Sequence, residues 1–429
     1  MKSAKSDRQL ALLDVQERAD AETYTIDRRA KIVRRDVLRR NGHISTSEVP
    51  LASESSFRSE DAAAVFDSSW LRAKERPSQP DAPVLRVADL FSGCGGLSIG
   101  VGEACRALGK RAEYVFATDI NEVALDVYRD NFDPAFSAST PIETLVDGAL
   151  GAPITSSERA LRSAVGEVDF VVAGPPCQGH SDLNNHTRRE DPKNQLVARV
   201  ARFVEVFRPA HVLIENVRGI RHDRLRSLEV AKTHLQRLGY VCDEAVLHAE
   251  TFGVAQKRSR YFLYASTAVV HPLLHLTRAA FTVEPRPISW AISDLVKSTA
   301  ESVFDTAATH SAENQRRIDY LFDNALHDLP DAERPPCHRS GGHSYKAVYG
   351  RLRWDLPAPT ITTGFGSMGQ GRFVHPLFRR TLTPHEAARL QFFPDHFSFG
   401  SRGRRQYQEL IGNAVPSKLA YAVVLHELR

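Results

Sequence analysis

Cys177 is the residue whose type and surroundings most strongly indicate covalent chemistry. It lies in the segment Ala173-Gly-Pro-Pro-Cys-Gln-Gly-His-Ser181, directly after two prolines that stiffen the backbone. A structural cysteine normally sits among apolar neighbours, whereas this thiol stands in a polar loop. Backbone amides and basic groups in such a loop stabilise a thiolate. The pattern therefore favours a nucleophile over a buried structural cysteine.

An acid and two cations follow further along the chain. Glu215, in Ile214-Glu-Asn-Val217, could protonate or hydrogen-bond a heterocycle nitrogen if it is partly desolvated, and a structural salt bridge is the alternative. Arg258 and Arg260, in Gln256-Lys-Arg-Ser-Arg260, point to the same face if the segment is extended. Two arginines on one face suit an anionic or carbonyl-bearing ligand, whereas the alternative is a solvated basic run.

A glycine-rich turn indicates a cofactor pocket. In Asp89-Leu-Phe-Ser-Gly-Cys-Gly-Gly-Leu-Ser98, three glycines allow the backbone to approach a ligand closely, although such turns also serve as plain strand-to-helix connections. The segment lacks the lysine of a P-loop. Asp119, which follows the next apolar run, could hold the two hydroxyls of a ribose, or it could cap a helix that begins near Glu122.

Short apolar runs must position these residues. Most of the runs are followed by a helical stretch, which predicts an α/β fold with a parallel sheet whose ligands lie beyond the carboxyl ends of the strands. Helical patterning resumes at Pro384 to Phe393 and at Ser417 to Leu428, after an irregular region that predicts a second, loop-rich domain. The expected strands are Leu85 to Leu90, Tyr114 to Thr118, Val168 to Ala173, His211 to Ile214 and Tyr261 to Ala265.

Residues 1–83 are charged and end in a Pro-rich segment, so we interpret them as an extension plus linker. Arg8 to Ala19 and Arg28 to Arg40 have helical composition, which favours a solvated helical arm over a dedicated DNA-binding module. The sequence assigns no function to this part.

Bulk composition restricts the cellular setting more than the function. The chain has 429 residues, enough for two or three domains, and its net charge of +4 permits a nucleic-acid partner without requiring one. The five cysteines are scattered without a CxxC pair, and no apolar stretch is long enough to cross a bilayer. We therefore expect a cytoplasmic protein.

As an ordered set, these motifs resemble those of the DNA cytosine-5 methyltransferase family, and the resemblance covers nearly everything from Leu85 to Arg429. It implies a Rossmann-like catalytic domain over residues 84–270, completed by 406–429, and a smaller target-recognition domain over 271–405. The matching segments are Asp89-Leu-Phe-Ser-Gly-Cys-Gly-Gly, Pro175-Pro-Cys-Gln, Glu215-Asn-Val, Gln256-Lys-Arg-Ser-Arg, Arg389-Leu-Gln-Phe-Phe-Pro394 and Gly412-Asn-Ala-Val-Pro416.

The resemblance also implies S-adenosylmethionine as the cofactor. Asp119 would hold its ribose and Ile120 would lie against its adenine. Where many members of the family place an aspartate on the adenine amino group, this chain has Ser139-Thr-Pro-Ile-Glu143, so the backbone or Thr140 would have to replace that contact. The other residues implied to line the pocket are Phe91, Gly93, Gly95, Gly96, Leu196 and Asn413.

The implied chemistry is methyl transfer to a flipped-out cytosine. Cys177 would add to C6, Glu215 would engage N3 and the exocyclic amine, and Arg258 with Arg260 would fix the base carbonyl and a nearby phosphate or the thiolate. The polar loop Gln178 to Asn194, with Arg188 and Arg189, would close over the DNA.

The small domain would read the bases in the major groove. Its segments Arg351-Leu-Arg-Trp354 and Pro359-Thr-Ile-Thr-Thr363 resemble the family's equivalent stretch. Cys337, His338 and His343 fall short of a four-ligand zinc pattern, so we expect no metal.

The expected partner is double-stranded DNA, in a restriction system that would add a cognate endonuclease, with the enzyme itself a monomer. Two other functions stay open on the sequence: a cytosine-5 methyltransferase acting on tRNA, and a non-catalytic DNA-binding relative. The long variable region favours DNA over tRNA, and a binding module would have no use for Cys177, Glu215 and the arginine pair together.

Overall fold

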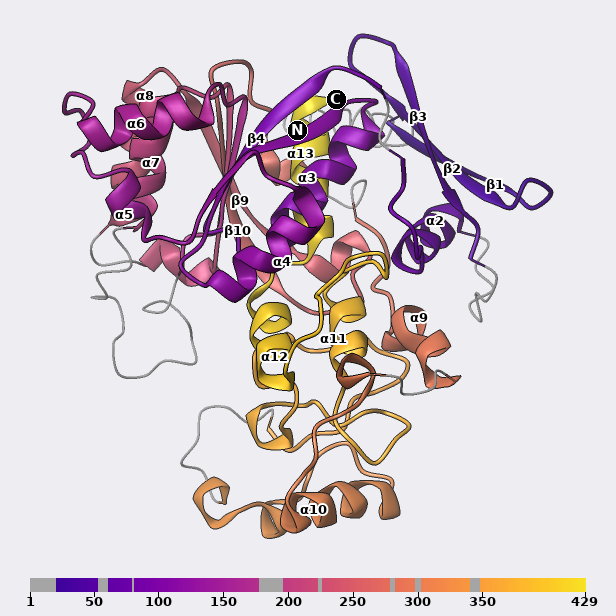
Figure 1. Cartoon of the computed structure of the whole chain (residues 1–429). Coiled ribbons are helices and arrows are strands. Elements are labelled where there is room, and N and C mark those ends of the chain that lie inside the picture. Colours follow the sequence, from indigo (N-terminus) through magenta and orange to yellow (C-terminus); the bar gives the residue numbers. More distant parts are fainter. Residues whose placement is uncertain are drawn as a thin grey trace, which may run out of the picture.

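A computed structural model describes residues 21–52, 61–78, 81–176, 196–222, 226–277, 282–297, 302–339 and 348–429, without the side chains of His222 and Cys337. The sheet and its helices form one part of the molecule, and a less regular part lies beneath it (Figure 1). Among the described residues, no helix has the length and apolar character that crossing a membrane requires.

The central sheet has seven strands. Six of them run in the same direction, and β10 is antiparallel to both of its neighbours, β8 and β9. In sheet order the strands are β6 (Phe136–Ala138), β5 (Arg111–Thr118), β4 (Val84–Leu90), β7 (Phe170–Ala173), β8 (His211–Asn216), β10 (Ser259–Ser266) and β9 (Val241–His248).

All five expected strands are confirmed, but the expectation of a wholly parallel sheet is wrong. The last expected strand is β10, which runs antiparallel because it returns from β9 through a short connection rather than through a crossover helix. The sequence analysis missed β9, which carries Asp243 and Glu244, and β6, which has three residues. Neither strand has the uninterrupted apolar run that marks a buried strand.

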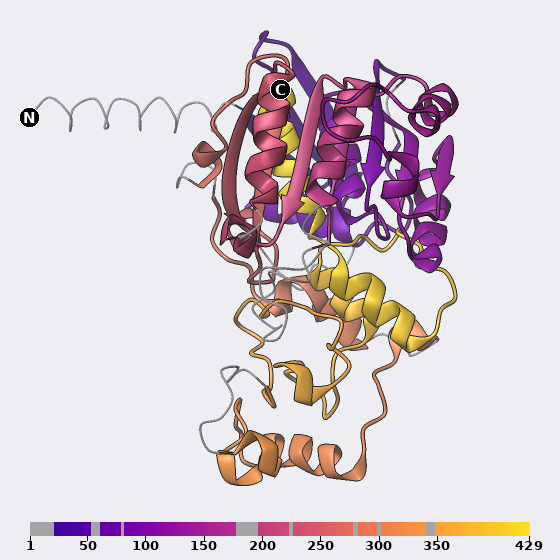
Figure 2. The ribbon, with the colours of Figure 1, turned by 90° about the vertical axis from the view of Figure 1, so that its left-hand side faces the viewer.

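Helices cover both faces of the sheet. Side chains of β4 alternate between them: Val87 packs in the core beneath α3, α4 and α13, and Ala88 packs in the core beneath α6, α7 and α8. Figure 2 shows α7 and α8 in front of the strands. The helices are α3 (Gly96–Ala107), α4 (Glu122–Phe132), α5 (Ile142–Leu145), α6 (Ser156–Val165), α7 (Leu196–Phe207), α8 (Ser227–Arg237) and α13 (Ser417–Leu428).

Helix α13 packs so closely on α3 that side chains would prevent the contact. A Cβ added to Gly100 would lie 2.2 Å from the carbonyl oxygen of Ser417, and one added to Gly96 would lie 2.7 Å from that of Val415. The expected helix from Ser417 to Leu428 is confirmed. The C-terminal segment therefore lies directly beside the helix that follows the glycine-rich turn.

The N-terminal segment forms a small sheet and a helix packed on α3 and α13, so the helical interpretation of residues 28–40 is wrong. Val33, Arg35 and Val37 alternate with more exposed residues, which is the period of a strand. Arg8 to Ala19 lies outside the described residues. The elements of this N-terminal layer are β1 (Glu22–Asp27), β2 (Ile32–Leu38), β3 (Ile44–Pro50) and α2 (Ala62–Leu71).

A buried arginine anchors the N-terminal layer. Arg35 is 1% exposed and donates to Glu103 on α3 at 2.9 Å, to Tyr421 on α13 at 3.0 Å and to Ser47 on β3 at 3.1 Å. Its guanidinium also lies 4.7 Å from the centre of the Phe66 ring on α2. One side chain thus joins four elements.

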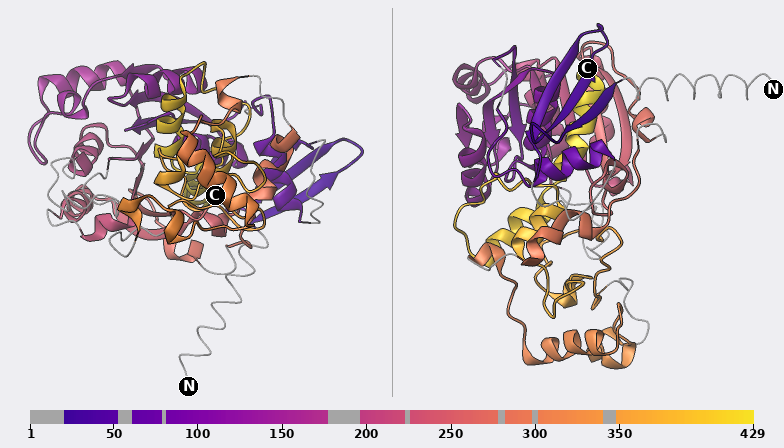
Figure 3. Two further views of the ribbon diagram at one scale, coloured as in Figure 1. Left: turned by 90° about the horizontal axis from the view of Figure 1, so that it is seen from below. Right: turned by 90° about the vertical axis from the view of Figure 1, so that its right-hand side faces the viewer.

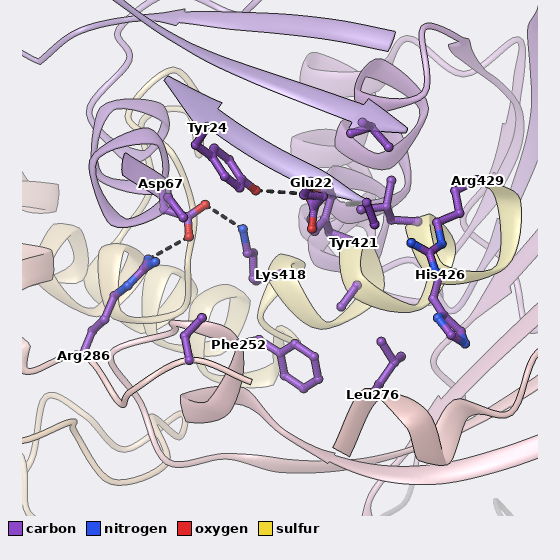
Figure 4. Close-up of a pocket in the computed structure, with 16 residues that line it drawn as sticks. Glu22, Tyr24, Asp67, Phe252, Leu276, Arg286, Lys418, Tyr421, His426 and Arg429 are labelled. Atoms are coloured by element: carbon purple, nitrogen blue, oxygen red, sulfur yellow. Dashed lines mark hydrogen bonds and ion pairs between the residues drawn. The ribbon is translucent and has the colours of Figure 1, made fainter. Parts of the chain in front are cut away.

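A cavity of about 370 Å³ lies beside this anchor, between the N-terminal layer and α13 (Figure 4). Asp67 on its wall accepts hydrogen bonds from Lys418 at 2.6 Å and Arg286 at 2.7 Å, and Glu22 accepts from Tyr24 at 3.0 Å and also from Tyr421. Asp67 is thus paired with Lys418 across the two layers, and Glu22 is hydrogen-bonded to a tyrosine of each.

The less regular part contains the helices α9 (Ile288–Ile292), α10 (Ala312–Asp323), α11 (Pro384–Leu390) and α12 (Arg404–Asn413). A separate small core around α10 includes Ile318, Leu321 and Val374. The main core runs without a break from the sheet into α9, α11 and α12, so the domain boundaries at residues 271 and 405 stay predictions. Figure 3 shows this part beneath the sheet in a second orientation.

Arg35→Ala should lower the free energy of unfolding by about 3 kcal/mol, because it removes one partner of a buried, hydrogen-bonded ion pair. Glu103 keeps its hydrogen bonds to Arg106, so the loss of stability should lie at the lower end of the range for a broken buried ion pair. Urea unfolding followed by circular dichroism measures the change. The control is Arg34→Ala, whose exposed pair with Glu48 should contribute little to stability because solvent screens it. Equal losses for the two variants would contradict the anchoring role.

Candidate active site

The carboxyl ends of the parallel strands bring the expected site residues to one edge of the sheet. Phe91 follows β4, Asp119 follows β5 and Glu215 lies near the end of β8. A Cβ added to Gly174, after β7, would lie 3.6 Å from Oε2 of Glu215 and 3.9 Å from the carbonyl oxygen of Phe91. Three strand ends therefore meet within van der Waals contact.

The turn after β4 has the backbone of a ligand-binding turn. Phe91, Gly93 and Gly95 have φ values of 59°, 53° and 97°, and Gly95 is the N-cap of α3. A Cβ at Gly95 would come 2.1 Å from the Phe132 ring, so a side chain is excluded there by space as well as by conformation. The first turn of α3 presents backbone N–H groups toward this edge, which favours a polar or anionic ligand group.

Asp119 is tied to the glycine-rich turn. Its Oδ2 accepts the N–H of Gly93 at 2.8 Å and its Oδ1 accepts the N–H of Asn121 at 2.8 Å. Burial raises the pKa of this carboxyl, and the backbone hydrogen bonds act in the opposite direction. The capping alternative is wrong, because Asn121 is the N-cap of α4.

Ile120 and the turn after β6 flank Asp119. Ile120 is 69% exposed, so its apolar face is available to a flat ligand group. The hydroxyl of Thr118 donates to the carbonyls of Ala138 at 2.9 Å and Thr140 at 3.4 Å, which fixes the start of the segment that lacks the usual aspartate. Thr140 itself is half-buried.

Leu196 and Asn413 reach the same edge from distant parts of the chain. Leu196 begins α7 and belongs to the core cluster against which Phe91 packs. Asn413 is exposed at the end of α12, two residues before Val415, whose carbonyl oxygen contacts Gly96. The structure thus brings Asn413 close to the glycine-rich turn.

Glu215 is a buried acid at the end of β8. It is 6% exposed, and its Oε1 lies 2.8 Å from Nε of Arg260. Burial raises its pKa, and the charges of Arg260 and Arg258 oppose that rise. A carboxyl with a raised pKa holds a proton more readily near neutral pH, which suits hydrogen bonding to a ring nitrogen.

The two arginines of the pair have different surroundings. Arg260 lies beside Glu215, whereas the terminal nitrogens of Arg258 donate to the carbonyls of Ile361 at 2.7 Å and Gly412 at 3.4 Å. Both charges act on Glu215, but Arg258 is also bound to the less regular part of the molecule.

Cys177 and the loop Gln178 to Asn194 lie outside the described residues, so their roles stay predictions. The residues just before the thiol are described. Nδ2 of Asn216, next to Glu215, donates to the carbonyl of Pro175 at 3.2 Å, which holds the proline pair against the end of β8. The chain therefore leaves β7 directly beside Glu215.

The expectation of no metal concerned three residues, of which two cannot be placed: His343 and the side chain of Cys337 lie outside the described residues. The ring of His338 packs edge-on against Tyr349, with 5.3 Å between ring centres. Within the described part of the chain, no three His, Cys, Asp or Glu side chains are grouped so as to hold an ion.

Sequence reasoning missed several polar residues that support the site. Asp89 is buried beneath the glycine-rich turn and accepts a hydrogen bond from Ser98 at 2.6 Å, and burial raises its pKa to about 8. Asn216, Gln256 and Gln391 are buried and hydrogen-bonded behind the strand ends. All four belong to motifs that the sequence analysis quoted, but their spacing gave no sign of their partners.

Comparison with known proteins gives the chain its family. Residues 85–426 match the family described as C-5 cytosine-specific DNA methylase. The type II methyltransferase M1.BsuMI of Bacillus subtilis (strain 168) is 56% identical over 396 residues, which cover 92% of each chain. DNA (cytosine-5)-methyltransferase 1A of Oryza sativa subsp. japonica is 27% identical over 79% of this chain, which spans only 28% of that protein.

A solved structure agrees on the fold. The crystal structure of the S. pombe Dnmt2 methyltransferase superposes with a TM-score of 0.54 at 18% sequence identity, and covers 80% of this chain and 98% of that one. The family match spans most of the chain, including the glycine-rich turn, Cys177, Glu215 and the paired arginines. The chain therefore belongs to the C-5 cytosine-specific DNA methylase family and is a DNA (cytosine-5-)-methyltransferase that uses S-adenosylmethionine.

Proposed function

We propose that Cys177, Glu215 and Arg260 carry out methyl transfer at the edge where β4, β7 and β8 end. The observation that supports this most directly is the convergence at Gly174, whose neighbours are the Glu215 carboxyl and the Phe91 backbone of the glycine-rich turn. A nucleophile three residues after Gly174 would lie between the acid and the cofactor turn.

The residues around the glycine-rich turn fit S-adenosylmethionine. We assign the two ribose hydroxyls to Asp119, whose orientation is fixed by backbone N–H groups, and the adenine face to the exposed Ile120. Phe91, Gly93, Gly95, Gly96, Leu196 and Asn413 complete the proposed pocket. The cofactor supplies a methyl group activated by a sulfonium.

The described cysteines make poor alternative nucleophiles. Burial raises the pKa of Cys94 and of Cys105 to about 12 and that of Cys242 to about 11. A thiol with such a pKa is almost entirely protonated at neutral pH, and the thiolate is the reactive form. This leaves the polar loop of Cys177 as the better setting for a thiolate.

The proposed chemistry follows from the electronics of cytosine, whose C5 is a poor nucleophile until a thiolate adds at C6. Glu215 would hydrogen-bond N3 and the exocyclic amine as negative charge develops on the ring, and Arg260 would hold the base carbonyl. Arg258 would act indirectly, by holding the backbone carbonyls of Ile361 and Gly412 in place. Loss of the C5 proton then lets the sulfur leave C6.

We propose duplex DNA as the substrate, with the target base flipped out by the loop 178–194 and its neighbours read by the small domain. The 56% identical relative is named a type II methyltransferase, which supports a restriction-modification role for this chain. We further propose that the protein is cytoplasmic, acts as a monomer and has a cognate endonuclease. Bisulfite sequencing of DNA from cells that express the protein maps its site.

Cys177→Ala should abolish methyl transfer and leave S-adenosylmethionine affinity within about twofold, because the thiol forms the covalent bond but does not hold the cofactor. The measurements are tritiated-methyl incorporation and covalent trapping on 5-fluorocytosine oligonucleotides, with DNA and RNA in parallel. The matched control is Cys242→Ala, which should remain active and form the DNA adduct. Methyl transfer by the Cys177 variant would remove the nucleophile from the mechanism, and trapping on RNA alone would contradict the DNA substrate.

Glu215→Gln should slow transfer by about 100-fold, because the amide cannot donate a proton to the ring as charge develops. Since burial raises the pKa of Glu215, the wild-type rate should fall as pH rises through that pKa, and the variant should lack this fall. Single-turnover rates across pH test both expectations. Glu229→Gln, an exposed change on α8, is the control. A normal rate for the Glu215 variant would exclude the acid.

Asp119→Ala should weaken S-adenosylmethionine binding by about 10- to 100-fold, because hydrogen bonds to a charged group contribute about 1.5–3 kcal/mol. Isothermal titration calorimetry measures the dissociation constant. Asp126→Ala removes a carboxylate from the outer surface of α4 and should bind as wild type does. Unchanged affinity in the Asp119 variant would place the ribose elsewhere.

A further inference from the structure

Three buried polar side chains join the sheet to the less regular part of the molecule. Gln256 and Arg258 come directly before β10, and Gln391 follows the last residue of α11. Their exposed fractions are 0%, 4% and 0%. We call these three residues the interdomain clamp.

The two glutamines are bonded to each other. Nε2 of Gln256 donates to Oε1 of Gln391 at 2.9 Å and to the carbonyl of Leu390 at 3.1 Å. Since a buried amide without partners is costly, this pairing fixes the orientation of both side chains.

Gln391 in turn holds the end of α12. Its Nε2 donates to the carbonyls of Ile411 at 2.7 Å and Ala414 at 3.2 Å, on either side of Asn413. The last carbonyls of a helix lack partners within the helix, and this amide supplies one. The position of Asn413 therefore depends on a side chain that is fully buried.

The other end of the clamp holds the segment 358–363 of the small domain. Oε1 of Gln256 accepts the N–H of Ile361 at 2.8 Å, and Arg258 donates to the carbonyl of the same residue at 2.7 Å. A Cβ at Gly412 would come 2.3 Å from the backbone nitrogen of Thr363, so this segment lies directly on the end of α12. A shift of residues 361–363 cannot occur without a response at residues 411–414.

The end of α12 leads to the cofactor side of the molecule. Val415 contacts Gly96, the first residue of the helix after the glycine-rich turn, at a distance that leaves no room for a Cβ. Side-chain hydrogen bonds of the clamp and close backbone contacts thus connect the small-domain segment, Asn413 and the glycine-rich turn in one series.

We propose that the interdomain clamp positions Asn413 over the glycine-rich turn and thereby couples DNA bound by the small domain to cofactor affinity. The inference rests on the proposed function, because it takes the cofactor to lie at that turn and the DNA to lie on the small domain. Gln391 is a positioning residue in this scheme. Such coupling is reciprocal, so DNA strengthens cofactor binding and the cofactor strengthens DNA binding by the same factor.

The test uses the full chain with Gln391→Met, which keeps the length of the side chain without its amide, and Gln391→Glu, which keeps the acceptor for Gln256 but loses the amide donor. S-adenosylhomocysteine is titrated calorimetrically, alone and with a saturating duplex that carries the site mapped by bisulfite sequencing. For wild type, the duplex should lower the dissociation constant by about fivefold or more. Each variant should bind about tenfold more weakly without DNA and should lose most of the effect of DNA.

Gln315→Met is the matched control, because Gln315 on α10 also donates two hydrogen bonds, to Asp319 and to the carbonyl of Arg379, far from the clamp. Its titration without DNA should match wild type. The clamp is refuted if both Gln391 variants keep wild-type affinity and the full effect of DNA, or if they lose thermal stability alone. Asp119→Ala distinguishes failure of the clamp from failure of the proposed cofactor site. If the Gln391 variants and the Asp119 variant all bind S-adenosylhomocysteine normally, the proposed cofactor site is refuted. If only the Asp119 variant binds weakly, the clamp alone is refuted.

Discussion

The close contact between α3 and the chain from Ala414 to Tyr421 constrains much of the remaining structure. It requires glycine at positions 96 and 100, because a Cβ at either would overlap backbone atoms of the C-terminal segment. The contact places the last turn of α12 beside the glycine-rich turn, and it makes α13 a wall of the main core. Residues more than 300 positions apart in the sequence therefore form a single edge, where we propose that the cofactor binds.

The N-terminal layer extends this arrangement on the outside. Arg35 binds α3 and α13 together, so it supports the same helix pair from the side away from the strand ends. The match to M1.BsuMI covers 92% of the chain, which is more than residues 85–426 can account for, so that relative shares part of this segment. The match to the rice enzyme covers 79% of the chain. The buried ion pairs of the layer make it a part of the folded unit.

Much of the catalytic edge was predictable because its residues follow apolar runs. A run such as Phe170 to Ala173 is recognisable as a buried strand, and parallel strands must present their carboxyl ends together. This reasoning placed Phe91, Asp119 and Glu215 correctly at one edge. It failed for β2, because the helical composition of the segment was given more weight than the alternation of Val33, Arg35 and Val37. It also failed for β9, because the acidic residues of that strand interrupt its apolar pattern.

By itself, the sequence determined the family, the activity and the positions along the chain of five strands, because these depend on residue types and on local periodicity. Only the tertiary structure decided the direction of β10, the attachment of the N-terminal layer and the partners of the buried polar side chains. Gln256 and Gln391 show the reason: they are 135 residues apart, and a hydrogen bond across that distance leaves no periodic trace in the sequence. Such a bond exists because packing removes both amides from water, and the free energy of satisfying them is decided by the folded chain.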